Sequence, residues 1–396
     1  MSRSERLRLS AVVFVVLFTQ LLIYPGVDRL VTGLGGEPTV DAGTAFLAVQ
    51  LLAFVLFSAV WGAVSDRFGR RVPFIVVGAI GGSVAYLALA AVLLADVGDF
   101  RTALALRFLE GTFTIGAFSL SITMLMDLGG GHGRNMGAAG IAIGAGAALG
   151  APVGGGLYIF GPLAPVLVAA ALLAAAAVVI STLPDRTPSR APPLGVVLDS
   201  FRGTPGLVVP FAFGFADRFA AGFFGLIGTF YFRDTFDLDP SGIGLLLACF
   251  FVPFALLQYP FGMISDRIGR VGPIVAGSAG FGIAILAVGF APTVGTAALG
   301  MLVVGVLGAL VAPATMALVT DLVASTERGA AMGAFNIFGS FGFLGGIIVG
   351  GLLATRYGYA VAFLVAGGLE IVIAIVALPV LLSVGSDSTT RTGARE

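Results

Sequence analysis

The chain contains twelve long apolar stretches, separated by short polar or proline- and glycine-rich segments. A transmembrane helix needs about 20 mostly apolar residues, and each of these stretches is long enough to cross a bilayer. With 58% hydrophobic and 11% charged residues, the chain is far more apolar than a soluble core requires. We therefore predict an all-α polytopic membrane protein. The approximate spans are 9–31, 43–64, 73–95, 103–127, 135–160, 163–183, 206–231, 241–264, 273–291, 294–320, 329–353 and 359–383.

A short charged loop occurs twice in the chain. The first copy, residues 62–73, reads GAVSDRFGRRVP, and the second, residues 262–273, reads GMISDRIGRVGP, with seven of twelve positions identical. Each copy joins two predicted spans, which indicates an internal duplication of six spans plus six. The predicted parts are a first six-helix bundle at 1–183, a polar, proline-rich linker at 184–205, a second six-helix bundle at 206–383 and a tail at 384–396.

Arginine supplies all 21 basic residues, and its distribution predicts the orientation of the spans. With a cytoplasmic N-terminus, fifteen arginines fall on the cytoplasmic side, four on the outer side and two inside spans. This bias follows the positive-inside rule, so we expect a multi-pass protein of the plasma membrane with both termini in the cytoplasm. The first apolar run reaches spanning length without a small-residue cleavage site, which indicates an uncleaved first helix. The absence of lysine favours a GC-rich, prokaryotic genome.

The doubled loop and the six-plus-six spans resemble the major facilitator superfamily. The pattern Gly-x-x-x-Asp-Arg-x-Gly-Arg-Arg between spans 2 and 3, echoed between spans 8 and 9, carries this resemblance, which covers nearly the whole chain. It implies two six-helix bundles around a cavity that opens alternately to either side. In that family the loop is a conformational latch between the halves. The matching positions are Gly62, Asp66, Arg67, Gly69, Arg70 and Arg71 in the first copy and Asp266, Arg267, Gly269 and Arg270 in the second.

Physical chemistry gives the loop residues separate reasons to be there. The glycines permit a tight reversal, and Asp66 is able to accept hydrogen bonds from a neighbouring helix N-terminus, where the dipole favours an anion. The alternative, that the arginines only fix topology, is compatible with a latch. Spans 4 and 10 also end alike, with an acid followed seven residues later by an arginine, and we assign these groups to helix-end and latch electrostatics. They are Asp127 with Arg134 and Asp321 with Arg328.

Span 4 carries Arg107 and Glu110 within the predicted bilayer region. The two are three residues apart, hence on one helix face, and we predict that they pair. Ionisable groups at this depth are costly unless paired or facing water, so both are candidates for proton coupling or substrate binding. The spacing from Arg107 to Gly111 also resembles the family's fourth-helix motif, whose arginine is associated with proton coupling. The alternative is a purely structural pair.

Span 7 carries Asp217 and Arg218 near its middle. Adjacent helix positions diverge by about 100°, so we expect one side chain to line the cavity and the other to face a neighbouring helix. A carboxylate in such a site is able to bind and release a proton, so Asp217 and Arg218 join Glu110 as coupling or substrate candidates. Glu370 lies equally deep in span 12, which the resemblance places at the periphery, and we expect it to face a neighbouring helix.

Span 5 is rich in small residues at intervals of three or four, which lets helix backbones approach closely. Its end resembles the family's antiporter-type motif Gly-Pro-x-x-Gly-Gly, although Ala151 stands where the motif has its first glycine. The alternative is glycine-mediated packing at the interface between the halves, without any export-specific meaning. Span 11 has a related glycine run. The positions assigned to helix packing are Gly144, Gly150, Pro152, Gly155, Gly156, Gly345 and Gly346.

Few uncharged polar side chains lie inside the spans. Phenylalanine outnumbers tyrosine and tryptophan, 33 against seven and one, so a lining of this composition offers few hydrogen-bonding aromatic groups. An amphipathic or lipophilic substrate suits such a lining better than a sugar does. The polar candidates for substrate contact are Gln20, Tyr24, Gln50, Gln258, Tyr259 and Asn336.

The residues and the resemblance together predict a secondary active transporter that works by alternating access, with proton-coupled efflux of a small, lipophilic molecule favoured. The alternatives are a proton symporter or facilitator that imports a nutrient and, from another class, a non-transporting membrane sensor or enzyme. One Cys and one His supply no metal-ligand cluster or nucleophile–base set, so we expect no enzyme, no metal and no cofactor besides the coupling proton. A net charge of zero argues against nucleic acid. We expect a small-molecule substrate, a lipid bilayer and a functional monomer.

Overall fold

The computed structural model describes residues 3–95, 99–128, 132–185, 204–324 and 327–392. Twelve helical segments in these ranges are long and apolar enough to cross a membrane, which confirms the predicted number, and each overlaps its predicted range. The elements assigned in the described chain are all helices, so the predicted all-α class is confirmed. Residues 186–203 of the predicted linker lie outside the described residues.

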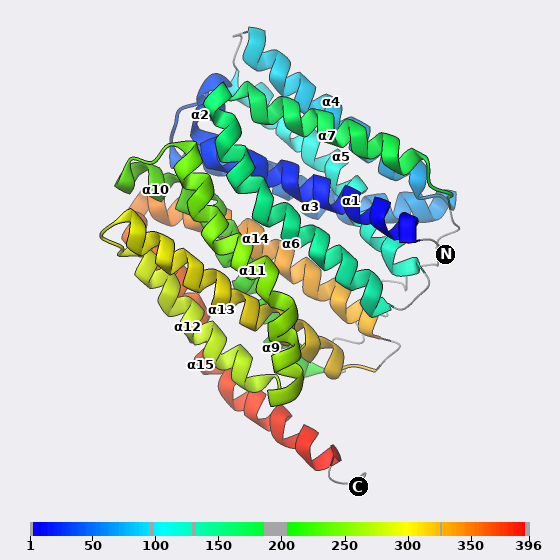
Figure 1. The fold of residues 1–396 in the computed structure, drawn as a ribbon, viewed down its shortest axis with the longest axis vertical. Coiled ribbons are helices and arrows are strands. Elements are labelled where there is room, and N and C mark those ends of the chain that lie inside the picture. Colours follow the sequence, from blue (N-terminus) through cyan, green and yellow to red (C-terminus); the bar gives the residue numbers. More distant parts are fainter. Residues whose placement is uncertain (1–2, 96–98, 129–131, 186–203, 325–326, 393–396) are drawn as a thin grey trace. The chain divides into compact units, whose positions relative to one another are not determined.

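The helices follow the chain in the predicted six-plus-six order (Figure 1). The first six spans are formed by α1 (Arg3–Leu22) with η1 (Tyr24–Gly26) and α2 (Val27–Gly33), α3 (Val40–Phe68), α4 (Val72–Ala95), α5 (Phe100–Asp127), α6 (His132–Leu157) with η2 (Tyr158–Phe160), and α7 (Leu163–Ser181). The last six are formed by η3 (Pro205–Leu207), α9 (Val208–Phe223), a π-helical turn (Phe224–Gly228) and α10 (Thr229–Phe236), then α11 (Pro240–Ile268), α12 (Val271–Gly289), α13 (Val294–Asp321), α14 (Arg328–Tyr357) and α15 (Tyr359–Thr392). Helix α15 thus continues beyond the predicted end of the last span, through Thr392.

Local sequence signals set several of these helix ends. The side chain of Thr39 accepts a hydrogen bond from the backbone of Ala42 and caps α3. Thr293 and Thr296 form a reciprocal capping box at the start of α13. Gly69 and Gly269 follow α3 and α11 with φ of +64° and +90°, a left-handed conformation that glycine adopts without a steric cost. The two charged loops are therefore tight glycine turns between spans.

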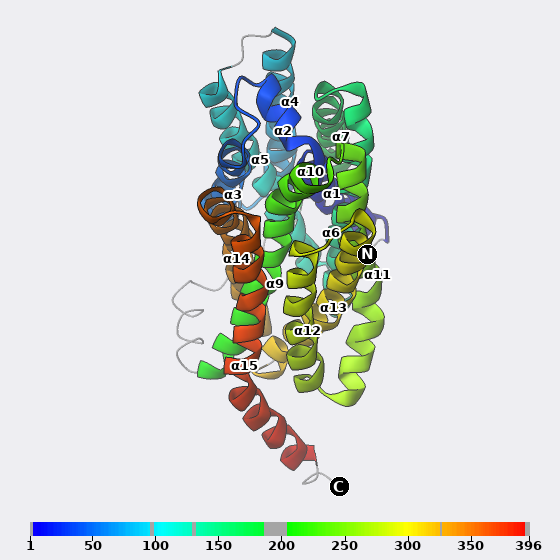
Figure 2. The same ribbon diagram turned by 90° about the vertical axis from the view of Figure 1, so that its left-hand side faces the viewer.

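The chain forms two compact units. The first comprises Met1–Arg190 with Gly225–Val252, and the second comprises Ala191–Phe224 with Pro253–Glu396. In the first unit α1 packs on α6, and α4 packs on both α5 and α7. In the second unit α9 packs on α14, and α12 packs on both α13 and α15; Figure 2 shows α9 beside α14 and α15. Counted by spans, these are the same contacts in both units, so the duplication in the sequence is repeated in helix packing.

Glycines allow the closest helix contacts in each unit. A Cβ atom added to Gly150 of α6 would lie 2.8 Å from the carbonyl oxygen of Phe18 in α1. A Cβ atom added to Gly346 of α14 would lie 2.8 Å from the backbone nitrogen of Phe223 in α9. Both distances are too short for a real side chain, so these helices meet backbone to backbone. We call these contacts the glycine seams.

The other predicted packing positions lie in different surroundings. Gly155 faces the backbone of Pro240 at the start of α11, within the first unit, and Gly345 is in ordinary contact with the rings of α9. Nothing lies within 4 Å of a Cβ atom added to Gly156. Gly144 is buried, and Pro152 is half-buried inside α6. The glycine-rich end of span 5 therefore serves two helix contacts, one with α1 and one with α11.

Candidate functional site

Arg107 and Glu110 form an ion pair inside the first unit. Nη1 of Arg107 lies 2.9 Å from Oε2 of Glu110, and the two side chains are 0% and 1% exposed. The predicted pairing of these α5 residues is thus confirmed. A buried pair is stable only when its remaining hydrogen-bonding groups also find partners, because both charges have been removed from water.

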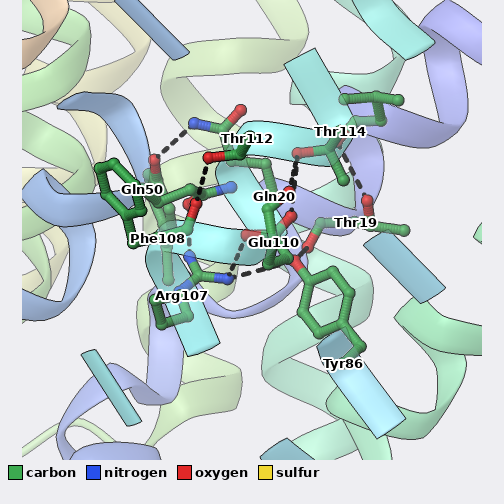
Figure 3. A network of polar contacts seen from close by, with 11 residues as sticks. Thr19, Gln20, Gln50, Tyr86, Arg107, Phe108, Glu110, Thr112 and Thr114 are labelled. Atoms are coloured by element: carbon green, nitrogen blue, oxygen red, sulfur yellow. Dashed lines mark hydrogen bonds and ion pairs between the residues drawn. The ribbon is translucent and has the colours of Figure 1, made fainter. Parts of the chain in front are cut away.

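Three neutral groups surround the guanidinium of Arg107, and Figure 3 shows two of them, Gln50 and Tyr86. Nη2 donates to the side-chain oxygen of Gln50, and Nη1 also donates to the hydroxyl of Tyr86 at 3.4 Å. The ring centroid of Phe46 lies 4.8 Å from the guanidinium carbon, a cation–π distance. Nε has no partner among the described residues. The positive charge of Arg107 is thus balanced by Glu110 and solvated by uncharged side chains.

The carboxylate of Glu110 has its own hydrogen-bond donor on the same helix. The hydroxyl of Thr114 lies 3.1 Å from Oε1 and 2.8 Å from the backbone carbonyl of Glu110. Next to the carboxylate, a Cβ atom added to Gly111 would lie 2.5 Å from the carbonyl oxygen of Gln50. The absence of a side chain at Gly111 therefore lets α3 approach α5 closely enough for Gln50 to reach the guanidinium. We call Gln50, Tyr86, Arg107, Glu110 and Thr114 the Arg107 network.

Helix α1 adds two further polar contacts in this region. The hydroxyl of Tyr86 lies 3.5 Å from the carbonyl oxygen of Thr19, and the amide of Gln20 donates to the hydroxyl of Tyr24 at 3.1 Å. The predicted candidates Gln20 and Tyr24 are thus brought together, and both are buried. Sequence reasoning missed Tyr86 and Thr114, for which the available signal was a lone hydroxyl in the middle of an apolar span.

The predicted candidates of the second unit are dispersed. Asp217 of α9 is 9% exposed, and its carboxylate has no hydrogen bond with the residues that the structure describes. Arg218 lies against α14, where a Cβ atom added to Gly339 would be 3.1 Å from its Cγ. Arg218 thus faces a neighbouring helix, which is the place expected for one of the two side chains. Gln258 is half-buried on α11, and Asn336 is exposed on α14.

Glu370 faces a neighbouring helix, as expected. Its side chain is 1% exposed in α15, and the hydroxyl of Ser278 in α12 donates to Oε2 at 2.5 Å. Oε1 has no hydrogen-bond partner among the described residues. A buried carboxyl oxygen without a partner is costly in an apolar environment, so this group differs sharply from the fully partnered Glu110.

The first charged loop is held by a buried arginine. The guanidinium of Arg71 is 4% exposed, pairs with Asp127 at the end of α5, and lies 3.7 Å from Asp66. We expected Asp66 to accept hydrogen bonds from a helix N-terminus, but here that group is Asp185, whose Oδ1 accepts from the backbone nitrogens of Arg71 and Val72. Asp66 lies within the last turn of α3, so its carboxylate meets the loop arginine instead.

The second charged loop repeats the arrangement with a different arginine. Arg270 pairs with Asp266 at 2.5 Å and with Asp321, at the end of α13, at 3.1 Å. Its aligned residue in the first loop is Arg70, which is exposed, whereas the paired residue there is Arg71. Burial lowers the pKa of Arg270, but the two carboxylates outweigh it and hold that pKa above its ordinary value. Arg67 and Arg267 are exposed, Gly62 is half-buried, and the side chain of Arg134 lies outside the described residues.

A small polar pocket lies away from these groups. It measures about 210 Å³ and is lined by residues of α2, α10, α11 and the segment 237–239 that joins the last two, including Asp28, Arg233 and Asp239. Arg233 also pairs with Asp28 at 3.2 Å beside this pocket. Sites for small organic ligands usually measure roughly 300 to 1,000 Å³, so we do not assign the substrate to it. Within the described residues, no group of three or more His, Cys, Asp or Glu is placed to hold a metal ion.

Twelve spans, a repeated helix-packing pattern and buried ionisable groups in both units define a polytopic membrane protein of the transporter class. A model of the Major Facilitator Superfamily matches residues 9–227 and residues 211–396. The chain therefore belongs to the major facilitator superfamily of transporters.

Several relatives are similar to parts of this chain. An uncharacterized MFS-type transporter of Methanocaldococcus jannaschii is 32% identical over 41% of this chain and 42% of that protein. The puromycin resistance protein of Streptomyces alboniger is 39% identical over 24% of this chain and 19% of its own length. The class G tetracycline resistance protein of Vibrio anguillarum is 27% identical over 73% of this chain and 74% of that protein. The match thus spans less than half of the first two relatives, and two of the three are resistance proteins.

Solved structures of the superfamily share the fold. The nucleoside transporter NupG has a TM-score of 0.74 at 18% identity, covering 96% of this chain and 99% of that chain. The D-xylose-proton symporter has a TM-score of 0.73 at 17% identity, covering 94% and 96%. At such low identity these neighbours support the fold and leave the substrate open.

Proposed function

We propose that this transporter couples the outward movement of a small, lipophilic molecule to the inward movement of protons. The buried Arg107 network carries this proposal, because it places a carboxylate inside the membrane with its charge balanced by one guanidinium. A group of this kind changes the balance of charge in the network whenever it gains a proton. No cofactor other than the proton is required.

The proposed coupling step starts at Glu110. When Glu110 accepts a proton, the ion pair with Arg107 is lost, and the guanidinium keeps only the neutral partners Gln50 and Tyr86. An uncompensated buried charge costs several kcal/mol, roughly 3 to 5, so the protonated state favours a rearrangement of α3, α4 and α5 that exposes or re-solvates Arg107. Proton binding thereby biases one conformation of the transporter over another.

Asp217 is the second proposed coupling carboxylate. It lies deep in α9, is 9% exposed, and has no hydrogen bond with described residues. Such a carboxyl exchanges a proton without first breaking an ion pair, unlike Glu110. Each unit would then contribute one proton-binding side chain, and substrate would move in the opposite direction to the protons.

The resistance relatives support export, and the composition supports a lipophilic substrate. Drug-resistance proteins of Streptomyces alboniger and Vibrio anguillarum are similar to this chain, and 33 phenylalanines offer apolar surface for an amphipathic drug. The second candidate function is proton-coupled import of a nutrient, because the solved neighbours leave the direction of transport open. The two functions differ in the sign of the proton movement that the substrate provokes.

The charged loops complete the proposal. We place both termini and both loops on the cytoplasmic side of the plasma membrane, since fifteen arginines fall there. The ion pair of Arg71 holds the first loop at the end of α5, and the ion pair of Arg270 holds the second loop at the end of α13. We propose that these ties keep the helix ends together while the two six-helix bundles, 1–183 and 206–383, move during transport. The functional form is a monomer.

Proteoliposomes with an imposed pH gradient test the proposal. Lipophilic cations, tetracycline, puromycin, nucleosides and xylose are added one class at a time while the internal pH is followed. Proton movement opposite to the substrate supports efflux, and proton movement with the substrate supports the import alternative. If none of the classes moves protons although the reconstituted protein is folded, proton coupling to these classes is excluded.

A further inference from the structure

Glu370 is a buried carboxyl group that the proposed mechanism does not use. Its Oε2 accepts a hydrogen bond from Ser278, and its Oε1 has no partner among the described residues. The hydroxyl satisfies one oxygen and does not balance a negative charge. A fully ionised carboxylate with one unpartnered oxygen is expensive in an apolar interior, whereas a protonated carboxyl is not.

Helix packing brings Glu370 level with Asp217. Phe213 of α9 belongs to the same core cluster as Ala374 and Ala377 of α15, and the two helices run antiparallel. Further along the same interface, the ring centroids of Phe223 and Phe363 are 4.9 Å apart. These two contacts fix the register between the helices.

The register places both carboxyl groups on the facing stripes of their helices. Asp217 follows Phe213 by four residues, and Glu370 precedes Ala374 by four residues, about one helical turn in each case. Side chains separated by four residues lie on the same helix face. The register therefore brings the two carboxyl groups to the same level of the α9–α15 interface.

Arg218, next to Asp217 on α9, is the cation whose charge reaches Asp217, and the other described helices packed around the pair add none near it. Helix α12, which carries Ser278, has no charged residue between Val271 and Gly289. Helices α13 and α14 carry charged residues only near their ends, at Asp321 for α13 and at Arg328 and Arg356 for α14. Arg218 is adjacent to Asp217 in sequence but lies against Gly339 of α14.

We propose that Asp217 and Glu370 form a carboxyl–carboxylate pair that binds one proton between them, with Ser278 holding the glutamate. Two facing carboxylates without an intervening cation cannot both remain ionised, so the first proton to bind is retained by the pair. Its importance for transport rests on the proposed proton coupling, but the pair itself is testable without a substrate. Glu370 is then a positioning and proton-sharing partner of Asp217, and the pair is separate from the Arg107 network.

Carbon-13 NMR of the carboxyl carbons tests this pair in the full chain reconstituted in lipid. The chain has six glutamates, so the Glu370 signal is assigned by its loss in Glu370→Gln. We expect this signal to keep the position of a protonated carboxyl at pH values where a free glutamate side chain is ionised. Asp217→Asn should displace the Glu370 titration by about one pH unit or more, because the two sites titrate as one system.

Reciprocity separates proton sharing from a structural role. Glu370→Gln should displace the Asp217 titration by the same amount as Asp217→Asn displaces that of Glu370, since the coupling between two sites is mutual. Asp237→Asn, in an exposed turn, is the matched control and should displace neither titration.

If Asp217→Asn does not fold, two other variants replace it. The Glu370 titration is then followed in Ser278→Ala, and the Asp217 titration is followed in Glu370→Gln. Ionisation of Glu370 at the pH of a free glutamate side chain, or titrations insensitive to the partner, would overturn the pair and leave Glu110-based proton coupling untouched. If Asp217 and Glu370 share a proton but the protein moves no protons in proteoliposomes, the result would instead count against the proposed function.

Discussion

The polar centres of the two units differ although several pairs of equivalent helices pack in the same way. In the first unit, Arg107 and Glu110 are fully buried, paired at 2.9 Å, and supported by three neutral side chains. In the second unit, Asp217 has no hydrogen bond with the described residues, and Glu370 has one. The duplicated fold has therefore kept the packing of α1 on α6 and of α4 on α5 and α7 in the equivalent helices of the second unit, while its buried charges have become unlike.

Because of this difference, protonation has different consequences at the two polar centres. Protonation of Glu110 removes the counter-charge of Arg107 and so disturbs a network that joins α3, α4 and α5. Protonation of Asp217 breaks no ion pair with a described residue, so it changes local charge with little structural cost. We therefore expect the first centre to convert proton binding into movement and the second to hold protons.

The largest expected effect comes from removing the same type of charge in the two centres. Glu110→Gln should lower the free energy of unfolding by about 3 to 5 kcal/mol, because it leaves Arg107 buried and uncompensated. Asp217→Asn should change it by about 1 kcal/mol or less, because no ion pair is lost. Chemical denaturation in detergent micelles, followed by circular dichroism, measures both values.

The pH dependence sharpens this prediction. Protonated Glu110 is neutral, as glutamine is, so the stability difference between wild type and Glu110→Gln should shrink as the pH falls. Arg101→Gln, an exposed arginine in the first turn of α5, is the control and should be close to wild type at every pH. Equal losses in Glu110→Gln and Asp217→Asn would contradict the contrast between the centres.

Substitutions in the glycine seams test whether the two units differ only in their polar centres or also in the energetics of helix packing. Gly150→Ala and Gly346→Ala each place a methyl group against the backbone of the adjacent helix, so each should cost about 1 to 3 kcal/mol of stability. Gly156→Ala has open space and should be close to neutral. Thermal unfolding of the three variants compares them, and a cost confined to one seam would show that the duplicated packing is not energetically equivalent.

The charged loops extend the comparison to the helix ends. Asp127→Asn removes the main counter-charge of a buried guanidinium, that of Arg71, and should cost about 1 to 3 kcal/mol. Asp321→Asn removes a partner of the half-buried Arg270, whose other partner Asp266 remains, so the cost should be about 0 to 1 kcal/mol. High salt should weaken the second effect more than the first. The reverse order of costs would show that burial does not distinguish the two loops.

The smallest expected effect concerns the hydroxyl that supports Glu110. Thr114→Val removes its hydrogen bond to Oε1 of Glu110 and should cost about 0.5 to 1.5 kcal/mol. Thr112→Val on the same helix is a matched control, because that hydroxyl bonds only to the carbonyl oxygen of Phe108 among the described residues. Similar stabilities of the two variants would remove Thr114 from the Arg107 network.

The sequence predicted the fold better than the site. The length of the apolar stretches predicted the transmembrane spans, and the spacing of three residues predicted the Arg107–Glu110 ion pair. Both signals are local, because each lies along a single helix. The partners Tyr86 and Ser278 come from other helices, and a single hydroxyl in an apolar span carries no sequence signal of its contact. The alignment of the loops likewise favoured Arg70 as the counterpart of Arg270, whereas Arg71 makes the ion pair, since which arginine turns inward depends on Asp127 and the local turn.

Proton flux in proteoliposomes tests the central claim most directly. The compound that moves protons through the wild-type protein is applied to equal amounts of folded Glu110→Gln, Asp217→Asn and the control Arg101→Gln, and the internal pH is followed. We predict wild-type flux in the control and loss of most of the flux in both carboxyl variants. Unchanged proton-driven transport in both Glu110→Gln and Asp217→Asn would contradict the account and reduce the two buried centres to structural features.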